Sequence, residues 1–403
     1  MSNKAFTLSY RKIILFFLYI TPWIDVWNSS FGKDFSIGQF VRGLMIAFNI
    51  ILLVKVAAKS REVLNVLGII IYCMLQTIFC LFITSNESVG INIAYFLKFM
   101  LFTTECNVLT MGYKSGFVRE EDLIRFWKYS LFVTPALLII SNILKLGTKG
   151  RAGFYSSANA MSIILIIQVL LSVWFLRERK QYLLIALLNL SALVILGTKS
   201  PLLILVASFV LIMLFYSKHR IKLIITILSS AILLYFVATH FFSSQVEAIL
   251  NYQLYHLNYS LKTNSVETFI FSGRNNLLKD TIEVLNKRGL IFFATIFGVS
   301  PYGLGRITAA VYGLSSVRGI ELDFLEILLY YGVFVTIGVY SIFFKALFAR
   351  GSNKTYELFL NVAIIASLTY GVLGGHGITE GISATYCGIL VATKNIYAIK
   401  SKA

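Results

Sequence analysis

The sequence predicts an all-α fold, a polytopic membrane helix bundle, from three observations. Hydrophobic residues make up 58% of the chain and charged residues only 13%, whereas a soluble domain is about half apolar and a quarter charged. Apolar runs of about 20 residues, the length that crosses a bilayer, recur along the chain. The net charge is +18, and membrane proteins collect Lys and Arg in cytoplasmic loops. We therefore expect this basic chain to associate with a lipid bilayer and not with nucleic acid.

The apolar runs predict 12 transmembrane helices within a single membrane domain, 1–403. The runs cover residues 11–27, 37–56, 63–83, 90–111, 125–144, 157–176, 181–196, 201–217, 221–240, 322–346, 356–373 and 382–398. No small-residue cleavage site follows the first run, so we expect an uncleaved N-terminal helix. All four cysteines fall within apolar runs and are expected to be small buried side chains.

Basic residues predict the orientation of these helices. With the N-terminus in the cytoplasm, every second connection carries at least three Lys or Arg, while TSNESVG after the third run has none. Both termini are therefore expected to be cytoplasmic. The ninth and tenth helices flank an extracytoplasmic subregion, 241–320, with amphipathic stretches at 245–261 and 275–288. These stretches suit a membrane surface or the roof of a cavity. The apolar segment 291–298 is too short to span and is expected to re-enter the membrane or pack beneath this loop.

Some basic residues fall on the predicted outer side, against the usual bias. Those at 279, 287 and 288 lie on the polar face of an amphipathic stretch and are expected to be solvated. Four arginines instead stand in Gly-rich or turn-like surroundings: Arg151, Arg274, Arg306 and Arg318. The planar guanidinium binds phosphate through paired hydrogen bonds, which makes them candidates for a lipid-linked pyrophosphate, with lipid headgroups as the alternative. Lys199, in a GTKS turn that lacks the rest of a P-loop, is a further candidate substrate-binding residue.

Candidate catalytic groups stand at two other outer positions. Glu321 and Asp323 begin the tenth helix, and Glu326 follows one turn later. Residues two apart in a helix point in different directions, so a paired-carboxylate hydrolase is not predicted, and Asp323 also suits a helix N-terminus. His376 lies in the Gly-rich turn GVLGGHGITEG, where imidazole suits a general base and a surface histidine is the alternative. The base remains open among Glu321, Asp323 and His376.

Charges within the apolar runs are costly and require partners. Asp25 and Arg42 are expected to pair. Lys98 and Glu105 share one helix face, about 10 Å apart along the axis, and are expected to join an internal charge network. The sequence has no HExxH, no Cys/His zinc spacing, no GxSxG and no Walker A motif. These absences predict a reaction with no metal and no cofactor.

Several short segments resemble the bacterial Wzy-type O-antigen and capsule polymerases, which share a region with the O-antigen ligases. The matching pieces are KGRAGFYSSANAMSI at 149–163, LVILGTKSPLLIL at 193–205, FSGRNNLL at 271–278, IFGVSPYG at 296–303, ELDFLEILLYYGVFVTIG at 321–338 and GGHG at 374–377. They sample the chain from the sixth helix to its end, whereas the first five helices match only in character. Arg151 and Arg274 match the arginines of the family, and the charges at 306 and 318 would assist them.

The resemblance implies a metal-independent, inverting glycosyltransferase in the bacterial cytoplasmic membrane, with its site facing outward. The glycan growing on undecaprenyl pyrophosphate would be the donor, and a sugar hydroxyl of the next lipid-linked repeat unit the acceptor. A chain-length regulator and a flippase are the implied partners. Glu321 and Asp323 stand where the ligases carry histidine and asparagine, which favours polymerase over ligase. Two alternatives remain. One is a lipid-linked oligosaccharide flippase or other transporter, although no repeat relates the two halves of the chain. The other is an O-antigen ligase or another transferase that attaches glycan to a lipid or protein.

Overall fold

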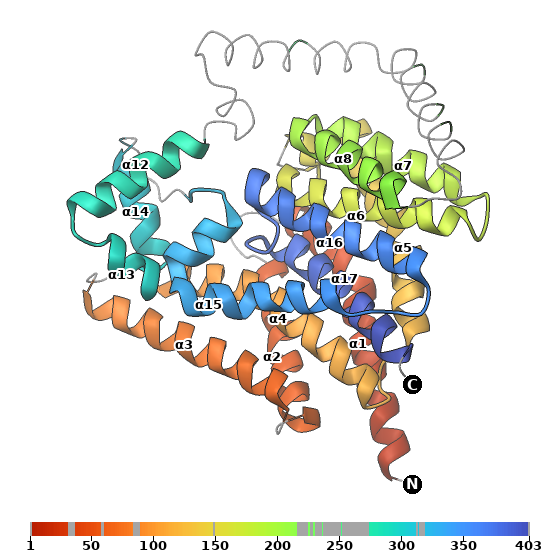
Figure 1. Cartoon of the computed structure of the whole chain (residues 1–403), viewed down its shortest axis with the longest axis horizontal. Coiled ribbons are helices and arrows are strands. Elements are labelled where there is room, and N and C mark those ends of the chain that lie inside the picture. Colours follow the sequence, from red (N-terminus) through yellow and green to blue (C-terminus); the bar gives the residue numbers. More distant parts are fainter. Residues whose placement is uncertain are drawn as a thin grey trace.

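The structure, a computed structural model, describes residues 2–30, 37–57, 60–83, 89–147, 150–215, 274–311 and 319–401, with single positions at 225, 229, 236, 251 and 313. Within these residues the fold is entirely helical (Figure 1). The helices are α1 (Ser2–Ser30), α2 (Ile37–Ala57), α3 (Arg61–Ile83), α4 (Val89–Lys114), α5 (Glu120–Ile143), η1 (Gly150–Ala152), α6 (Ala158–Leu176), α7 (Tyr182–Leu196), α8 (Lys199–Phe215), α12 (Arg274–Lys287), α13 (Ile291–Ile296), α14 (Pro301–Val311), α15 (Asp323–Phe348), α16 (Lys354–Gly374) and α17 (Gly381–Lys400).

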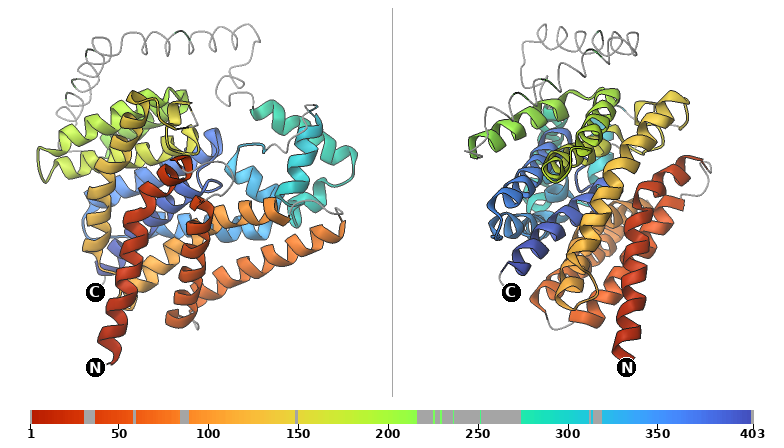
Figure 2. Two further views of the ribbon diagram at one scale, coloured as in Figure 1. Left: turned by 180° about the vertical axis from the view of Figure 1, so that it is seen from behind. Right: turned by 90° about the vertical axis from the view of Figure 1, so that its right-hand side faces the viewer.

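Six of these helices are long and apolar enough to cross a membrane. They are α2, α3, α5, α6, α15 and α16, while α7 and α8 are apolar but shorter. Eleven of the 12 predicted runs coincide with helices, and the run 221–240 lies outside the described residues. The class of helical membrane protein is therefore confirmed, and the count of 12 crossings stays a prediction. α1 begins and α17 ends on the same side of the bundle (Figure 2).

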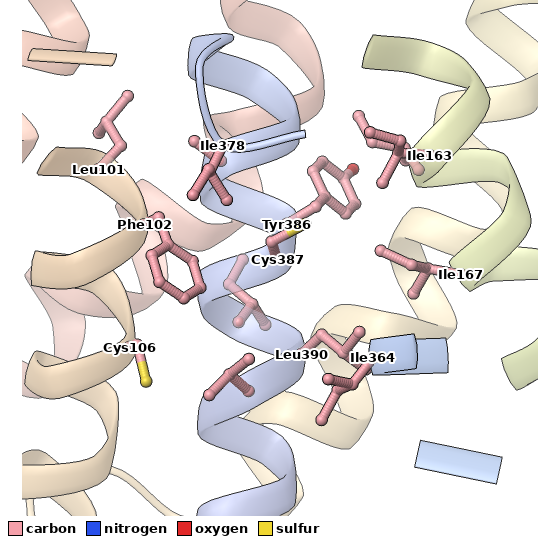
Figure 3. Close-up of a cluster of buried hydrophobic side chains, with 14 of the residues drawn as sticks. Leu101, Phe102, Cys106, Ile163, Ile167, Ile364, Ile378, Tyr386, Cys387 and Leu390 are labelled. Carbon is pink, nitrogen blue, oxygen red and sulfur yellow. The ribbon is translucent and has the colours of Figure 1, made fainter. Parts of the chain in front are cut away.

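The centre of the bundle is α17, which is buried along almost its whole length. It packs against α4, α6, α15 and α16. In Figure 3, Cys387 and Leu390 of α17 lie among side chains of α4, α6 and α16. Gly388 permits the close approach of α4, since a Cβ there would meet the Phe102 carbonyl oxygen at 2.9 Å. Cys73, Cys106 and Cys387 are buried and free, as predicted, and the Cys80 side chain lies outside the described part.

Helix α15 is broken at Gly332, where φ is 81° and ψ is 174°. The backbone after α13 fills the break: the N–H of Val299 donates to the Leu329 carbonyl at 2.9 Å, and that of Ser300 to the Tyr330 carbonyl at 3.1 Å. Gln76 of α3 also donates to the Tyr330 carbonyl. These bonds satisfy backbone groups that an intact helix would pair internally, as a low-dielectric environment requires. The segment 291–298 thus packs against the broken α15.

The amphipathic stretch 275–288 forms α12, with Leu277 and Leu285 buried. This helix packs on α14, and together with α13 it forms a cluster at one side of the molecule (Figure 1). The other predicted amphipathic stretch, 245–261, lies outside the described residues apart from position 251.

The charges predicted within the apolar runs all have polar partners, although not all as expected. Asp25 and Arg42 form the predicted ion pair at 2.7 Å. Lys98 and Glu105 belong to separate contacts: Lys98 Nζ lies 2.8 Å from Glu380, and Glu105 accepts a hydrogen bond from Asn49 Nδ2 at 2.8 Å. The two residues point along the same helix face but lie about two turns apart. Lys98 is therefore paired with a carboxylate just before α17, whereas Glu105 is hydrogen-bonded to a neutral amide of α2.

Candidate functional site

Four connecting segments meet at one end of the bundle, where α6, α15 and α17 begin. Arg274 of α12 contacts Glu321, just before α15. Asp323 contacts residues 377–379 between α16 and α17. Glu380 contacts Ser156, just before α6. These segments are distant in sequence, and all carry candidate site residues or adjoin them.

Arg274 and Glu321 form an ion pair in which both side chains are partly buried. Both Nε and Nη2 of Arg274 donate to Oε2 of Glu321, at 3.1 and 2.9 Å. The two side chains are 13% and 35% exposed, so the pair is reachable from outside but partly desolvated. A guanidinium already oriented toward one oxyanion is suited to bind another, such as a phosphate.

Glu321 is held in a backbone conformation that favours glycine, with φ of 61°. Its N–H donates to Oε1 of Glu326 at 2.8 Å, and its carbonyl lies so close to Gly375 that a Cβ there would overlap it. Tyr330 Oη also donates to Oε1 of Glu326, at 3.2 Å. Glu326 is 3% exposed, so it supports the strained Glu321 from beneath. Strain of this kind is concentrated at functional sites.

Asp323, the first residue of α15, connects this helix to the His376 turn. Its Oδ2 accepts from the N–H groups of Gly377 at 2.6 Å and Ile378 at 2.8 Å. Its Oδ1 accepts from Thr379 Oγ1 at 2.5 Å. The residue is 1% exposed. Because both oxygens already accept hydrogen bonds within the fold, the geometry favours a role in placing the turn over one as a base.

His376 is presented by a tightly constrained turn. It has φ of 64° and follows Gly375, also at 64°. Ser383 Oγ donates to its carbonyl at 2.5 Å, while the next two N–H groups bind Asp323. The side chain is half-buried. Glu321 and His376 are thus both non-glycine residues with positive φ. The two segments touch where the Glu321 carbonyl contacts Gly375, the residue before His376.

The remaining predicted residues are more scattered. Arg151 lies in η1 with its guanidinium against Gly197, where a Cβ would overlap Nη1, at the turn between α7 and α8. Lys199 is the first residue of α8. Arg306 is exposed on α14, and Arg318 lies outside the described residues. The structure therefore brings Arg274, Glu321, Asp323 and the His376 turn together, with Arg151 on a neighbouring turn.

Glu380, which lies four residues after His376, is a site residue that the sequence analysis did not select. Its Oε2 accepts from Lys98 Nζ at 2.8 Å and its Oε1 from Ser156 Oγ at 2.9 Å. Burial acts to raise the pKa of this carboxyl, but the Lys98 charge and hydrogen bond, with weaker effects of His376 and Arg42, hold the pKa at about 2. Glu380 is therefore a permanent anion beside the His376 turn.

No cluster of metal-ligating side chains marks this end in the part of the chain that the structure describes. Within the described ranges no three His, Cys, Asp or Glu side chains are grouped so that they could hold a metal ion. A cavity of about 240 Å³ lies at the opposite ends of α4, α15 and α17, where Asn107, Ser341 and Asn395 are among its lining residues. It is remote from the Arg274–Glu321 pair.

No protein-family model and no curated protein matches this chain. The fold and the contacts described above define its class: a helical membrane protein with a charge-rich site where the connecting segments converge at one end of the bundle.

Proposed function

We propose that this protein is a polysaccharide repeat-unit polymerase that acts at the outer face of a bacterial cytoplasmic membrane. In the reaction, the glycan growing on undecaprenyl pyrophosphate is transferred to a sugar hydroxyl of the incoming lipid-linked repeat unit. The observation that carries the proposal is the Arg274–Glu321 ion pair beside the His376 turn. It supports the proposal because a guanidinium that already binds a carboxylate lies near a turn that carries an imidazole, through the contact between the Glu321 carbonyl and Gly375.

Arg274 is assigned to the pyrophosphate of the donor. The incoming pyrophosphate displaces Glu321 from the guanidinium and takes over its hydrogen bonds. The bond between the anomeric carbon and the pyrophosphate oxygen then breaks, and the leaving group departs with the electron pair. Arg274 stabilises the charge that develops on that oxygen, the type of effect worth about 10²–10³ in rate for a single donor. Arg151 and Lys199 are assigned to the same donor.

His376 is assigned as the base. Inversion requires the acceptor hydroxyl to attack the face opposite the leaving group, so the base belongs on a different element from Arg274. His376 meets this condition, because the α16–α17 turn carries it and Asp323 holds that turn. The acceptor oxygen forms the new bond to the anomeric carbon as its proton passes to the imidazole. Glu321 is then the resting partner of Arg274, and Asp323 positions the base.

A transporter of lipid-linked oligosaccharides is the second candidate, because a broken membrane helix such as α15 is typical of transporters. In those proteins the freed backbone groups bind the substrate. Here the Leu329 and Tyr330 carbonyls already accept hydrogen bonds from Val299, Ser300 and Gln76. The break therefore favours a structural role, and the polymerase proposal remains the better supported of the two.

Reconstitution distinguishes the candidates. Purified protein in liposomes is supplied with lipid-linked repeat units extracted from cells that lack it, and the products are separated by chain length. A ladder of polymer that is lost in Arg274→Ala supports the proposal, with Lys128→Gln as the control. Lys128 forms an exposed ion pair with Glu178 at 3.2 Å. Movement of repeat units across the bilayer without polymer indicates the transporter, and a single transfer to a lipid or protein acceptor indicates a ligase.

A further inference from the structure

Glu380 joins the two segments that carry Arg151 and His376. It stands at the N-cap position of α17 but makes no side-chain capping hydrogen bond, because its two oxygens are divided between two other elements. Oε1 accepts from Ser156 Oγ at 2.9 Å, before α6, and Oε2 accepts from Lys98 Nζ at 2.8 Å, in α4. The side chain is 13% exposed. A largely buried carboxylate with both oxygens in charge-assisted or hydroxyl hydrogen bonds is a fixed connection and not a reactive group.

The contact with Ser156 fixes the far end of the Arg151 segment. Its near end is held to α5, because Asn142 Nδ2 donates to the Arg151 carbonyl at 3.0 Å. The Tyr155 hydroxyl donates to the Thr134 carbonyl at 3.2 Å, and Ser157 caps α6. Ser156 contacts Glu380 at the start of α17, so its hydroxyl connects the Arg151 segment to the start of α17 and sets their distance at this contact.

The same carboxylate closes the His376 turn. Asp323 holds residues 377–379 from the α15 side, and Ser383 holds the His376 carbonyl from within α17. Glu380 adds the connection to Lys98 of α4. The turn is therefore fixed to α15, α17 and α4 within the five consecutive residues 376–380.

A second ion pair balances the charges around this connection. Arg42, which pairs with Asp25 at 2.7 Å, lies against the backbone next to Glu380: its Cδ and Nε are 2.9 and 3.0 Å from the position of a Cβ on Gly381. Two cations therefore face two carboxylates here. Loss of a single member leaves a partly buried charge without its partner, which is more disruptive than loss of an exposed pair.

We propose that Glu380 is a positioning residue for the reaction, which holds the Arg151 segment and the His376 turn at a fixed separation. Arg151, which binds the pyrophosphate, and His376, which acts as the base, can then act on the same substrate at the same time. This inference rests on the proposed function. It matters for the rate because a misplacement of reacting groups by only about 1 Å can cost about 10²-fold.

The test compares two variants that break different parts of the connection. Ser156→Ala removes only the contact with the Arg151 segment, and we expect the KM for the donor to rise about tenfold with kcat nearly unchanged. Ser156→Thr keeps the hydroxyl and should restore KM. Glu380→Gln weakens both contacts, so KM should rise and kcat should fall by about 10- to 100-fold. Lys128→Gln, at the exposed Lys128–Glu178 pair, is the matched control.

Hydrogen exchange measured on the same proteins provides a readout that does not depend on activity. Exchange should increase at 150–157 in Ser156→Ala and at both 150–157 and 375–380 in Glu380→Gln, relative to Lys128→Gln. If unaltered protein makes polymer but both variants retain its KM and kcat, the inference is wrong. The inference is also wrong if activity falls only in proportion to the amount of folded protein, so that Ser156→Ala does not raise KM and Glu380→Gln does not lower kcat per folded molecule.

Failure of the proposed function is a distinct result. In that case the unaltered protein itself makes no polymer, and hydrogen exchange decides whether Glu380 connects the two segments. Unchanged exchange in both variants would reject the connection, and increased exchange at both segments in Glu380→Gln would retain it as a structural device of another activity.

Discussion

Arg274 directs two donors, Nε and Nη2, at a single oxygen of Glu321, at 3.1 and 2.9 Å. The pair joins the start of α12 to Glu321, two residues before α15, across 47 positions of sequence. In the proposed reaction this is the contact that a pyrophosphate replaces. The two residues therefore have opposite effects on donor binding, and single substitutions can separate them.

Arg274→Ala should lower kcat/KM by about 10²–10³, since it removes the cation that stabilises the leaving group. Glu321→Gln should instead leave kcat within about threefold and lower the KM for the donor, because a neutral amide competes less strongly for the guanidinium. Both are measured by the rate of polymer formation at varied donor concentration. A fall of about 10² in kcat for Glu321→Gln would show that Glu321, and not His376, is the base.

Asp323→Ala should destabilise the fold through the His376 turn. It leaves the N–H groups of Gly377 and Ile378 and the Thr379 hydroxyl without their acceptor, and each buried unsatisfied group costs about 1–3 kcal/mol. The measurement is the thermal unfolding midpoint in detergent, with His376→Ala beside it. His376→Ala should abolish polymer formation while the midpoint changes little. Equal midpoints for the two variants would contradict the assigned roles.

Gly332→Ala should destabilise the protein by at least about 1–3 kcal/mol, because it combines a positive φ with a crowded site. The φ there is 81°, and a Cβ would overlap the Ile296 carbonyl. Gly68→Ala is the control, since Gly68 lies within helix α3 and a Cβ there meets nothing within 4 Å. That change should be neutral or stabilising by about 0.5–1 kcal/mol. The comparison is again made by thermal unfolding.

The contribution of Glu380 to stability should depend on pH in one direction only. Its pKa of about 2 lies below the ordinary value of 4.5 for this carboxyl, so the folded state favours the ionised form. The stabilisation is complete above the unfolded pKa and is lost as pH falls from that value toward the folded one. The difference in unfolding midpoint between unaltered protein and Glu380→Gln should thus be constant from neutral to mildly acidic pH and shrink under strong acidification.

A difference that instead grew with acidification would contradict this assignment. A change of midpoint confined to the range near neutrality would point to another group, since a carboxyl with so low a pKa stays ionised there.

The helical class could be predicted because hydropathy is a local property: each apolar run reports its own environment. The break in α15 could not, since the pattern FLEILLYYGVFVTIG has one charged residue, no proline and no polar interruption around Gly332. Gly332 is displaced from helical geometry by contact with Ile296 and the residues after it, which no window around Gly332 contains.

Part of the candidate site could be predicted from the sequence. Arg274, Glu321 and His376 stood out individually by residue type and surroundings, but which carboxylate binds the arginine depends on the path of the chain. Glu380 was missed because a single acid beside a helix start resembles a surface cap. Its partner Lys98 is 282 positions away, and only the assembled bundle shows that the two charges meet.

The interruption at Gly332 has a consequence for how the chain tolerates change. In an unbroken α-helix, one inserted residue turns everything beyond it by about 100°. The part of α15 before Gly332 carries Asp323 and Glu326. Its rotation is instead set by the hydrogen bonds that the Leu329 and Tyr330 carbonyls accept from Val299, Ser300 and Gln76. Insertions or deletions in the part of α15 after Gly332 therefore need not rotate the end that carries Asp323 and Glu326, and the length of that part can vary independently of the candidate site.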